Sequence, residues 1–156
     1  EFWKGGAGIY NGDGATLALR DSTVRDNTVT GGAGGGVYGF FNSTVTIERS
    51  TISGNSANDV GGGIRSLGNT TIVNSTISGN TSTGWHGGGV FHTDGAMTIS
   101  SSTVTGNTAP GGTAGGLFMG SFGAPDGSAS LQGSIVSGNS GDECMVLYGG
   151  PRCVRP

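Results

Sequence analysis

The two histidines of this chain, His86 and His92, are the first candidates for chemistry, because imidazole pairs can hold copper or zinc. They flank the extended run 87–91, and six extended residues span roughly 20 Å, so one metal ion cannot take both. His92 and Asp94 stand at alternate positions and could share a face, but two ligands alone make a weak site. The sequence therefore predicts surface histidines in turns, with neither a metal centre nor another cofactor.

Carboxylates are the next candidates, because polysaccharide lyases and hydrolases use them in clusters to bind calcium or to act as paired acid and base. When the repeats described below are aligned, Arg20 lies beside Glu48 and Asp21 beside Arg49. Such neighbours form opposite-charge pairs of the surface kind rather than a carboxylate cluster. We therefore predict no catalytic residues and no enzyme. The alternative left open is a polysaccharide-acting enzyme whose turn loops bring distant residues together.

A column of mostly aromatic side chains is the strongest candidate for a ligand or partner surface. It follows the first aliphatic residue of each repeat and comprises Tyr10, Tyr38, Arg65, Phe91 and Phe118. Alternation along a strand sends these side chains outward if the aliphatic residue points inward, and a guanidinium can stack on the rings. An exposed apolar stripe is typical of a contact surface, for a polysaccharide or a second copy of the protein. The alternative is that loops fold back and bury the stripe.

A pattern repeated five times must position all of these residues. Each unit opens with a glycine-rich run and an aliphatic, and continues through two alternating aliphatics to Ser-Thr-Val/Ile, a tripeptide that is degraded in the last unit. An asparagine follows three residues later: Asn27, Asn55, Asn80, Asn107 and Asn139. A unit this short cannot fold alone, so the units must stack.

Short alternating β-branched runs bounded by Gly, Asn, Asp and Ser predict strands rather than helices. The fold class is therefore all-β: a parallel β-helix of about five coils with three short strands per coil, each strand pairing with its equivalents above and below. Like residues then stack on like. The asparagine column is expected to form a ladder of side-chain amides, since asparagine carries both a donor and an acceptor. The alternative is that each asparagine is an exposed turn residue.

The two ends of the chain differ in sequence. Coils are predicted for residues 1–140, and the first coil begins almost at residue 1, which leaves an open end that could pair with itself or with further coils. Residues 141–156 are predicted to form a tail closed by a disulfide between Cys144 and Cys153, which implies an oxidising compartment. Two unpaired thiols are the alternative.

The repeat also carries a resemblance. Gly-Gly-Gly-Ile/Val followed by Ser-Thr-Ile-Ser-Gly-Asn resembles the right-handed β-helix repeats of large secreted and surface-anchored bacterial proteins. The closing segment 133–139, with a cysteine nearby, is similar to the last repeats of choice-of-anchor β-helix proteins. The resemblance implies a right-handed helix and an extracellular or cell-surface location. Related solenoids include adhesins, surface structural proteins and polysaccharide lyases.

Together these features predict a non-catalytic extracellular structural or adhesive β-solenoid, with head-to-tail assembly into a fibre as a hypothesis. The alternatives are a carbohydrate-binding module, a lyase-like enzyme fragment and an ice-binding protein. Ice binding would use the threonine array Thr23, Thr51, Thr76 and Thr103. A net charge of −3 gives no basic surface for nucleic acid, and the sequence contains no apolar run of about 20 residues that would span a membrane.

Overall fold

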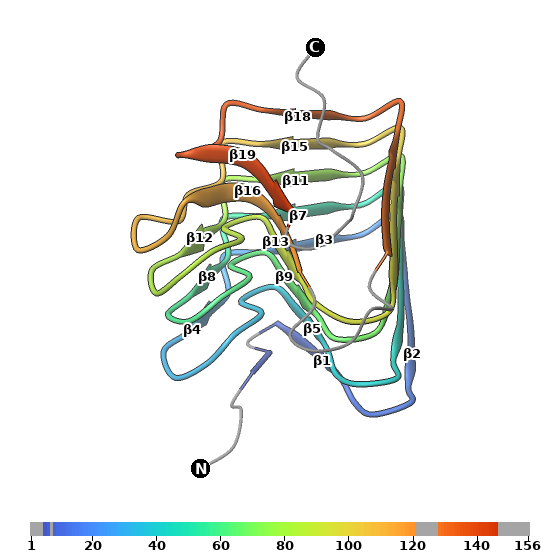
Figure 1. Ribbon diagram of the computed structural model, residues 1–156. Coiled ribbons are helices and arrows are strands. Elements are labelled where there is room, and N and C mark those ends of the chain that lie inside the picture. Colours follow the sequence, from blue (N-terminus) through green and yellow to red (C-terminus); the bar gives the residue numbers. More distant parts are fainter. Residues whose placement is uncertain (1–4, 7, 121–127, 147–156) are drawn as a thin grey trace.

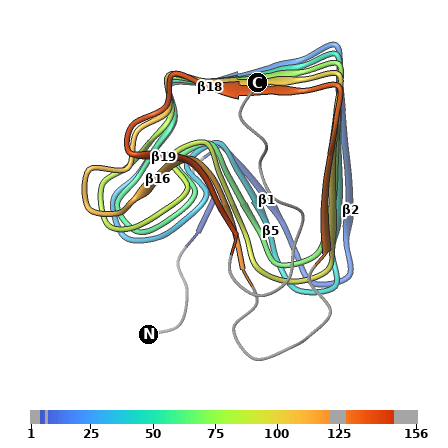
Figure 2. The same cartoon turned by 45° about the horizontal axis from the view of Figure 1, so that its top comes forward.

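The computed structural model describes residues 5–6, 8–120 and 128–146, and within them the chain forms 19 strands wound into a parallel β-helix (Figure 1). Three main strands follow one another in each coil and pair in parallel with their equivalents in the coils above and below. This confirms the predicted fold class. Seen in Figure 2, the coils lie almost over one another, because insertions fall in the turns and leave the strands in step.

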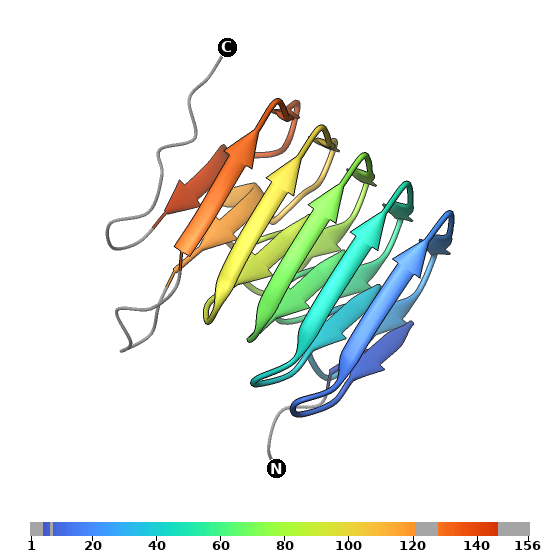
Figure 3. The same ribbon diagram turned by 90° about the vertical axis from the view of Figure 1, so that its right-hand side faces the viewer.

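Four sheets run along the solenoid. Sheet I joins β1 (Ile9–Asn11), β5 (Val37–Gly39), β9 (Ile64–Ser66), β13 (Val90–His92), β16 (Ala114–Met119) and β19 (Asp142–Val146). Sheet II joins β2 (Thr16–Arg20), β6 (Thr44–Glu48), β10 (Asn69–Val73), β14 (Ala96–Ser100) and β17 (Ser128–Gln132). The five strands of sheet II face the viewer side by side in Figure 3.

The remaining two sheets continue each coil. Sheet III joins β3 (Thr23–Arg25), β7 (Thr51–Ser53), β11 (Thr76–Ser78), β15 (Thr103–Thr105) and β18 (Ile135–Ser137). Sheet IV is small and joins β4 (Thr28–Val29), β8 (Ser56–Ala57) and β12 (Thr81–Ser82). Sheet IV was not predicted, since two-residue strands leave no periodic signal in a sequence. It lies in a lobe of loops that projects beside sheet I (Figure 1).

Inward side chains of sheets I, II and III form one continuous core. Alternation is regular in the interior coils: in β6, Val45 and Ile47 are buried while Thr44, Thr46 and Glu48 are partly exposed. The β-branched residues suit such strands because they pack well on a pleated surface. Equivalent aliphatic side chains pack on one another from coil to coil, as predicted, so the main core consists of stacked Val, Ile, Leu and Met side chains.

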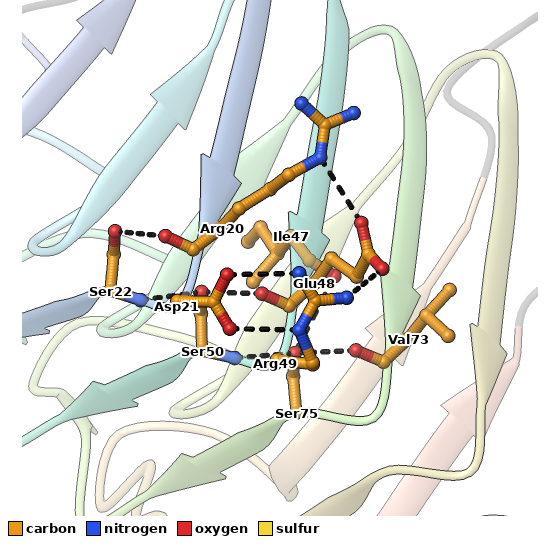
Figure 4. Close-up of polar contacts among 9 residues, drawn as sticks. All are labelled: Arg20, Asp21, Ser22, Ile47, Glu48, Arg49, Ser50, Val73 and Ser75. Atoms are coloured by element: carbon orange, nitrogen blue, oxygen red, sulfur yellow. Dashed lines mark hydrogen bonds and ion pairs between the residues drawn. The ribbon is translucent and has the colours of Figure 1, made fainter.

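The corner between sheets II and III needs a left-handed residue in every coil. The residues there are Asp21, Arg49, Asn74, Ser101 and Gly133, with φ between 46° and 53°. A serine follows each of them. The backbone N–H of the first four serines donates to the hydroxyl of the serine in the next coil, at 3.1 Å in every step from Ser22 to Ser134. Figure 4 shows the start of this serine ladder, which sequence analysis did not predict.

The next corner, just before the asparagines, is also left-handed and yields a prediction. Four of its five residues are glycines, and the fifth is Asp26, at φ 58°. The left-handed conformation costs a side-chain-bearing residue about 1 kcal/mol, so Gly79→Ala should lower the free energy of unfolding by about that amount. Asp26→Gly should raise it by about 0.5 kcal/mol, because the greater freedom of glycine in the unfolded chain offsets part of the gain. Urea denaturation of both variants measures this. A destabilised Asp26→Gly protein would contradict the argument.

The solenoid continues beyond the boundary predicted at residue 140. β19 pairs in parallel with β16, so the predicted tail begins as a sixth rung of sheet I. Its residues 141–144, Gly-Asp-Glu-Cys, align with the Gly-Gly-Gly-Ile of residues 61–64. The tail's remaining residues, 147–156, lie outside the described part of the chain.

Candidate functional site

The predicted aromatic column exists as a register but not as an exposed stripe. Neighbouring strands of sheet I place its five members directly above one another. Tyr10 at the end of the column is 53% exposed, whereas Tyr38, Arg65, Phe91 and Phe118 are each 5% exposed or less. The expectation of an exposed contact surface is therefore corrected for four of the five residues.

Loops of the lobe cover the column, which is the alternative left open above. Ala33, Val60 and Ala114 pack with Phe91 and Phe118 as a second hydrophobic core between the lobe and the outer face of sheet I. Glycine allows this close approach. A Cβ on left-handed Gly34 would lie 2.7 Å from the Cβ of Tyr38, and one on left-handed Gly87 would lie 2.8 Å from the Cβ of Phe91.

The aromatic rings and the guanidinium of the column stack on one another inside the second core. Phe91 and Phe118 stack at 4.5 Å between ring centroids, and His86 stacks on Phe118 at 4.8 Å. The guanidinium carbon of Arg65 lies 4.7 Å from the centroid of Phe91. Burial lowers the pKa of Arg65 and raises that of Tyr38, its neighbour in the column, and each of the two groups partly offsets the effect of burial on the other. These residues hold the lobe on the solenoid and present no ligand surface.

Neither histidine stands free in a turn. His86 stacks in the second core and its Nδ1 accepts the N–H of Thr113 at 3.1 Å. His92 is only 2% exposed, and its Nε2 lies 3.2 Å from the carbonyl oxygen of Gly95. The prediction of a surface histidine is thus wrong for His92, because β13 turns it inward, whereas His86 lies partly exposed in a bend between β12 and β13. Among residues 5–6, 8–120 and 128–146, no three His, Cys, Asp or Glu side chains come close enough together to hold a metal ion.

The burial of His92 predicts a pH dependence. Burial is the main cause that lowers its pKa below the ordinary 6.5, and the Gly95 carbonyl and the nearby Asp94 carboxylate oppose it. The unfolded chain then takes up a proton at a higher pH than the folded chain. Stability from neutral His92 is therefore fully present above pH 6.5 and is lost as the pH falls below it.

Urea denaturation of wild type and His92→Gln between pH 5 and pH 8 tests this expectation, over the range in which an ordinary histidine changes charge. The wild type should lose free energy of unfolding toward the acid end, and His92→Gln should lose less. His86→Gln is the matched control, since it keeps His92 and should keep the wild-type slope. Equal slopes for His92→Gln and wild type would refute the assignment.

The charged side chains at the corner of the first two coils pair as predicted (Figure 4). Arg20 contacts Glu48 at 3.1 Å, and Arg49 binds Asp21 through two bonds of 2.8 and 2.9 Å and also contacts Glu48. The hydrogen bond from Arg49 holds the pKa of the Asp21 carboxyl below its ordinary range. The cluster is largely exposed, so it contributes little to stability. Its carboxylates are engaged with arginines.

The five asparagines are bonded to one another through the length of the solenoid. Nδ2 of each of the first four donates to the Oδ1 of the asparagine in the next coil, at 2.9 to 3.0 Å. The same Oδ1 accepts the backbone N–H of the preceding asparagine, at 2.9 to 3.1 Å. Nδ2 of Asn55, Asn80 and Asn107 also donates to a carbonyl of sheet III, so each of these buried amides makes four bonds or more.

A glycine column lies against this ladder and explains part of the glycine-rich run. Its members are Gly8, Gly36, Gly63, Gly89 and Gly116. A Cβ at any of them would lie 2.8 to 3.0 Å from the amide nitrogen of the asparagine in the same coil. The backbone at this position can approach the ladder closely only because the residue has no side chain.

Small hydroxyl-bearing side chains occupy most outward positions of sheets II and III. In sheet II the central outward column is Ala18, Thr46, Thr71, Thr98 and Ser130. In sheet III one outward column is Thr23, Thr51, Thr76, Thr103 and Ile135, and the other is Arg25, Ser53, Ser78, Thr105 and Ser137. We call these three columns the hydroxyl face. Its threonines and serines were noted only for sheet III in the sequence.

The two cysteines lie near the C-terminal end of the sequence. Cys144 lies on β19, partly buried against the main core. Cys153 lies outside the described residues, so their disulfide stays a prediction. The part of the chain that the structure describes contains no helix long and apolar enough to cross a membrane.

Comparison with known protein families identifies a match. A family model described as "Right handed beta helix region" matches residues 2–124, more than half of the 156-residue chain. No curated protein and no solved structure matches the chain.

Proposed function

The chain belongs to the right-handed β-helix family, and from this membership we propose that it serves as a non-catalytic structural or adhesive β-solenoid outside the cell. This family architecture supports a rigid scaffold, because every coil shares its core and its two side-chain ladders with the coils beside it. The extracellular location rests on the resemblance of the repeats to secreted and surface-anchored proteins and on the predicted disulfide.

The observation that carries the proposal is that the residues whose side chains could take part in catalysis or metal binding are used in packing and ion pairs. His86 and Arg65 stack in the second core, His92 is buried, and Arg49 engages the carboxylates of the first corner. These residues support the fold. The hydroxyl face is what the repeat leaves regular and accessible, so contact with a partner falls there.

A surface polysaccharide suits the hydroxyl face as a partner. Its threonine and serine hydroxyls both donate and accept hydrogen bonds, as sugar hydroxyls do, and the neighbouring methyl groups can lie against sugar C–H groups. The strands repeat the columns at about 4.8 Å, which presents the same groups many times to an extended chain. The face also carries few charges, so a neutral polysaccharide can cover it without burying ionised side chains.

Sedimentation of the protein with insoluble neutral polysaccharides tests the adhesive role. A Thr71→Glu and Thr76→Glu double variant should lower binding roughly tenfold or more. The polysaccharide would cover the two new carboxylates without supplying an opposite charge. Thr28→Glu is the matched control, because Thr28 is exposed on β4 of the lobe. Equal loss of binding in both variants would place the contact elsewhere, and no binding by the wild type would leave a purely structural role.

Two other candidates are separated by their own measurements. A lyase-like enzyme would release products from acidic polysaccharides, with or without added calcium. An ice-binding protein would lower the freezing point more than the melting point. The threonine column of sheet III is in register, but it ends in Ile135 and runs beside Arg25 and serines. Ice binding needs a regular threonine array, so the hydroxyl face favours a polysaccharide over an ice lattice.

End-to-end assembly is the remaining part of the proposal. In the first coil Ile9, Leu17 and Leu19 are only partly buried, whereas Val37 and Ile47 above them are fully buried. Apolar surface of this kind is covered when another coil stacks on it, whether the coil belongs to a second copy or to a longer chain. Electron microscopy and sedimentation of the isolated chain test this assembly, and a monodisperse monomer at high concentration would count heavily against it.

A further inference from the structure

Charged side chains on the outward surface of sheets II and III are confined to the first two coils. Segments 16–26 and 44–54 carry all of them: Arg20, Asp21, Arg25, Asp26, Glu48 and Arg49. The aligned segments 69–79, 96–106 and 128–138 carry none. We call the outward side chains of these three segments the neutral tract. Its sheet II part lies on the green, yellow and orange strands of Figure 3.

The charges of the first two coils are paired, and the pairs are open to water. Arg49 binds Asp21 at 2.8 Å, and Arg20 binds Glu48 at 3.1 Å. The Arg20 side chain is 61% exposed and that of Asp21 is 65% exposed. A neutral polymer lying over these pairs would remove water from ionised groups without supplying a charge, which costs free energy. The first two coils are therefore a poor surface for such a polymer.

Short side chains without charge make the neutral tract a level surface. Its central column in sheet II is partly exposed and comprises Thr71, Thr98 and Ser130. Val73 lies where the preceding coil extends Glu48. Threonine is β-branched, so its χ1 angle is restricted and its hydroxyl is held in place before a ligand binds. The tract therefore presents fixed hydroxyl and methyl groups, and little side-chain freedom is lost when a ligand covers them.

We propose that the neutral tract is the contact surface for an extended neutral polysaccharide, and that the ion pairs of the first two coils mark its limit. The inference rests on the proposed function, since it places the binding site within one part of the hydroxyl face. Strand geometry spaces the groups of the tract about 4.8 Å apart between coils and about 7 Å apart along a strand. Their hydroxyls donate and accept hydrogen bonds, as sugar hydroxyls do, and need no ionised partner. A polymer that carries carboxylates would find no cation in the tract.

Sedimentation of the full chain with insoluble cellulose and chitin, two extended neutral polysaccharides, compares one substitution at two places in one column. Thr46 and Thr98 both lie in the central outward column of sheet II, and both are partly exposed. Thr98→Glu should lower binding roughly tenfold or more, because the polymer would cover its carboxylate. Thr46→Glu, outside the tract, should lower it less than about threefold. If Thr98→Glu does not fold, Ser100→Glu gives the same comparison from the same strand.

A variant without the ion pairs provides the opposite comparison. Serine at positions 20, 21, 48 and 49 gives the first two coils the residues that the fourth coil has in Ser100 and Ser101. The exposed pairs contribute little to stability, and Ser101 shows that the left-handed corner accepts serine, so the variant should fold. It should bind about twofold more tightly or better, because the uncharged surface becomes longer.

The outcomes separate the limit of the tract from the adhesive role itself. Equal loss of binding in Thr46→Glu and Thr98→Glu, or unchanged binding by the four-serine variant, would overturn the limit and leave adhesion by the hydroxyl face intact. Absence of wild-type binding to both polymers would overturn the adhesive role and the neutral tract together. Sedimentation velocity without polymer is measured as well. If Thr98→Glu dissociates a self-associated wild type, a second copy occupies the tract, which also overturns the proposal.

Discussion

Asn80→Ala is expected to lower the free energy of unfolding by about 3 to 5 kcal/mol. Asn80 is fully buried in the middle of the ladder. Its Oδ1 accepts the backbone and side-chain N–H groups of Asn55, both at 3.0 Å, and its Nδ2 donates to Asn107 at 2.9 Å and to the carbonyl of Ile52 at 3.0 Å. Alanine leaves the two donors of Asn55 and the Ile52 carbonyl without that partner in a dry interior, which costs more than the bonds contribute on average.

Urea denaturation followed by circular dichroism measures the loss, with Asn27→Ala as the matched control. Asn27 begins the ladder and is partly exposed. Its backbone N–H and its Nδ2 donate to Oδ1 of Asn55, and Nδ2 also donates to the carbonyl of Arg25 in its own turn. Water can replace part of what it loses, so its substitution should cost about 1 kcal/mol. Equal effects at the two positions would show that the ladder contributes through local turn geometry rather than through buried bonds between coils.

Gly63→Ala is expected to be comparably severe, by about 3 kcal/mol or more, for a steric reason. A Cβ on Gly63 would lie 2.6 Å from the carbonyl oxygen of Gly89 and 2.9 Å from Nδ2 of Asn80. Neither atom can move freely. The carbonyl accepts the N–H of Ile64 at 2.9 Å, and the amide holds the ladder together. One methyl group therefore has to separate two coils or break the ladder.

Gly31→Ala provides the control for Gly63→Ala. Gly31 is exposed, its φ is not in the left-handed region, and no atom lies within 4 Å of its Cβ position. Alanine there should change the free energy of unfolding by less than about 0.5 kcal/mol, or raise it slightly through the unfolded chain. Thermal unfolding of the pair gives the comparison. A Gly63→Ala protein as stable as Gly31→Ala would mean that the coils shift apart at little cost.

The asparagine and serine ladders run in the same direction along the solenoid. Both ladders donate from each coil toward the next coil in the chain, as Asn55 does to Asn80 and Ser50 to Ser75. Every interior coil therefore satisfies the coil before it. The last coil needs an acceptor from outside the pattern, and Glu143 supplies one from the strand that follows.

Sequence alone determined the coils, their register and the stacked asparagine and aliphatic columns. In a parallel β-helix the neighbour of each strand is the same strand one repeat away, so spacing along the chain specifies contacts in space. Five occurrences of Asn at one position place five amides in one row without any knowledge of loops. The charge pair of Arg20 and Glu48 follows from the same alignment.

Tertiary structure alone decided what covers each outward column. Alternation correctly directs Phe91 and Phe118 away from the main core, but it says nothing of the lobe that folds back over them. That lobe consists of irregular loops, whose path depends on close backbone approaches at residues such as Gly87 rather than on any period. The place of Glu143 at the end of the asparagine ladder did leave a signal, since residues 141–144 align with residues 61–64. Its meaning required coordinates, because a carboxylate replaces an amide only when its oxygens reach the same hydrogens.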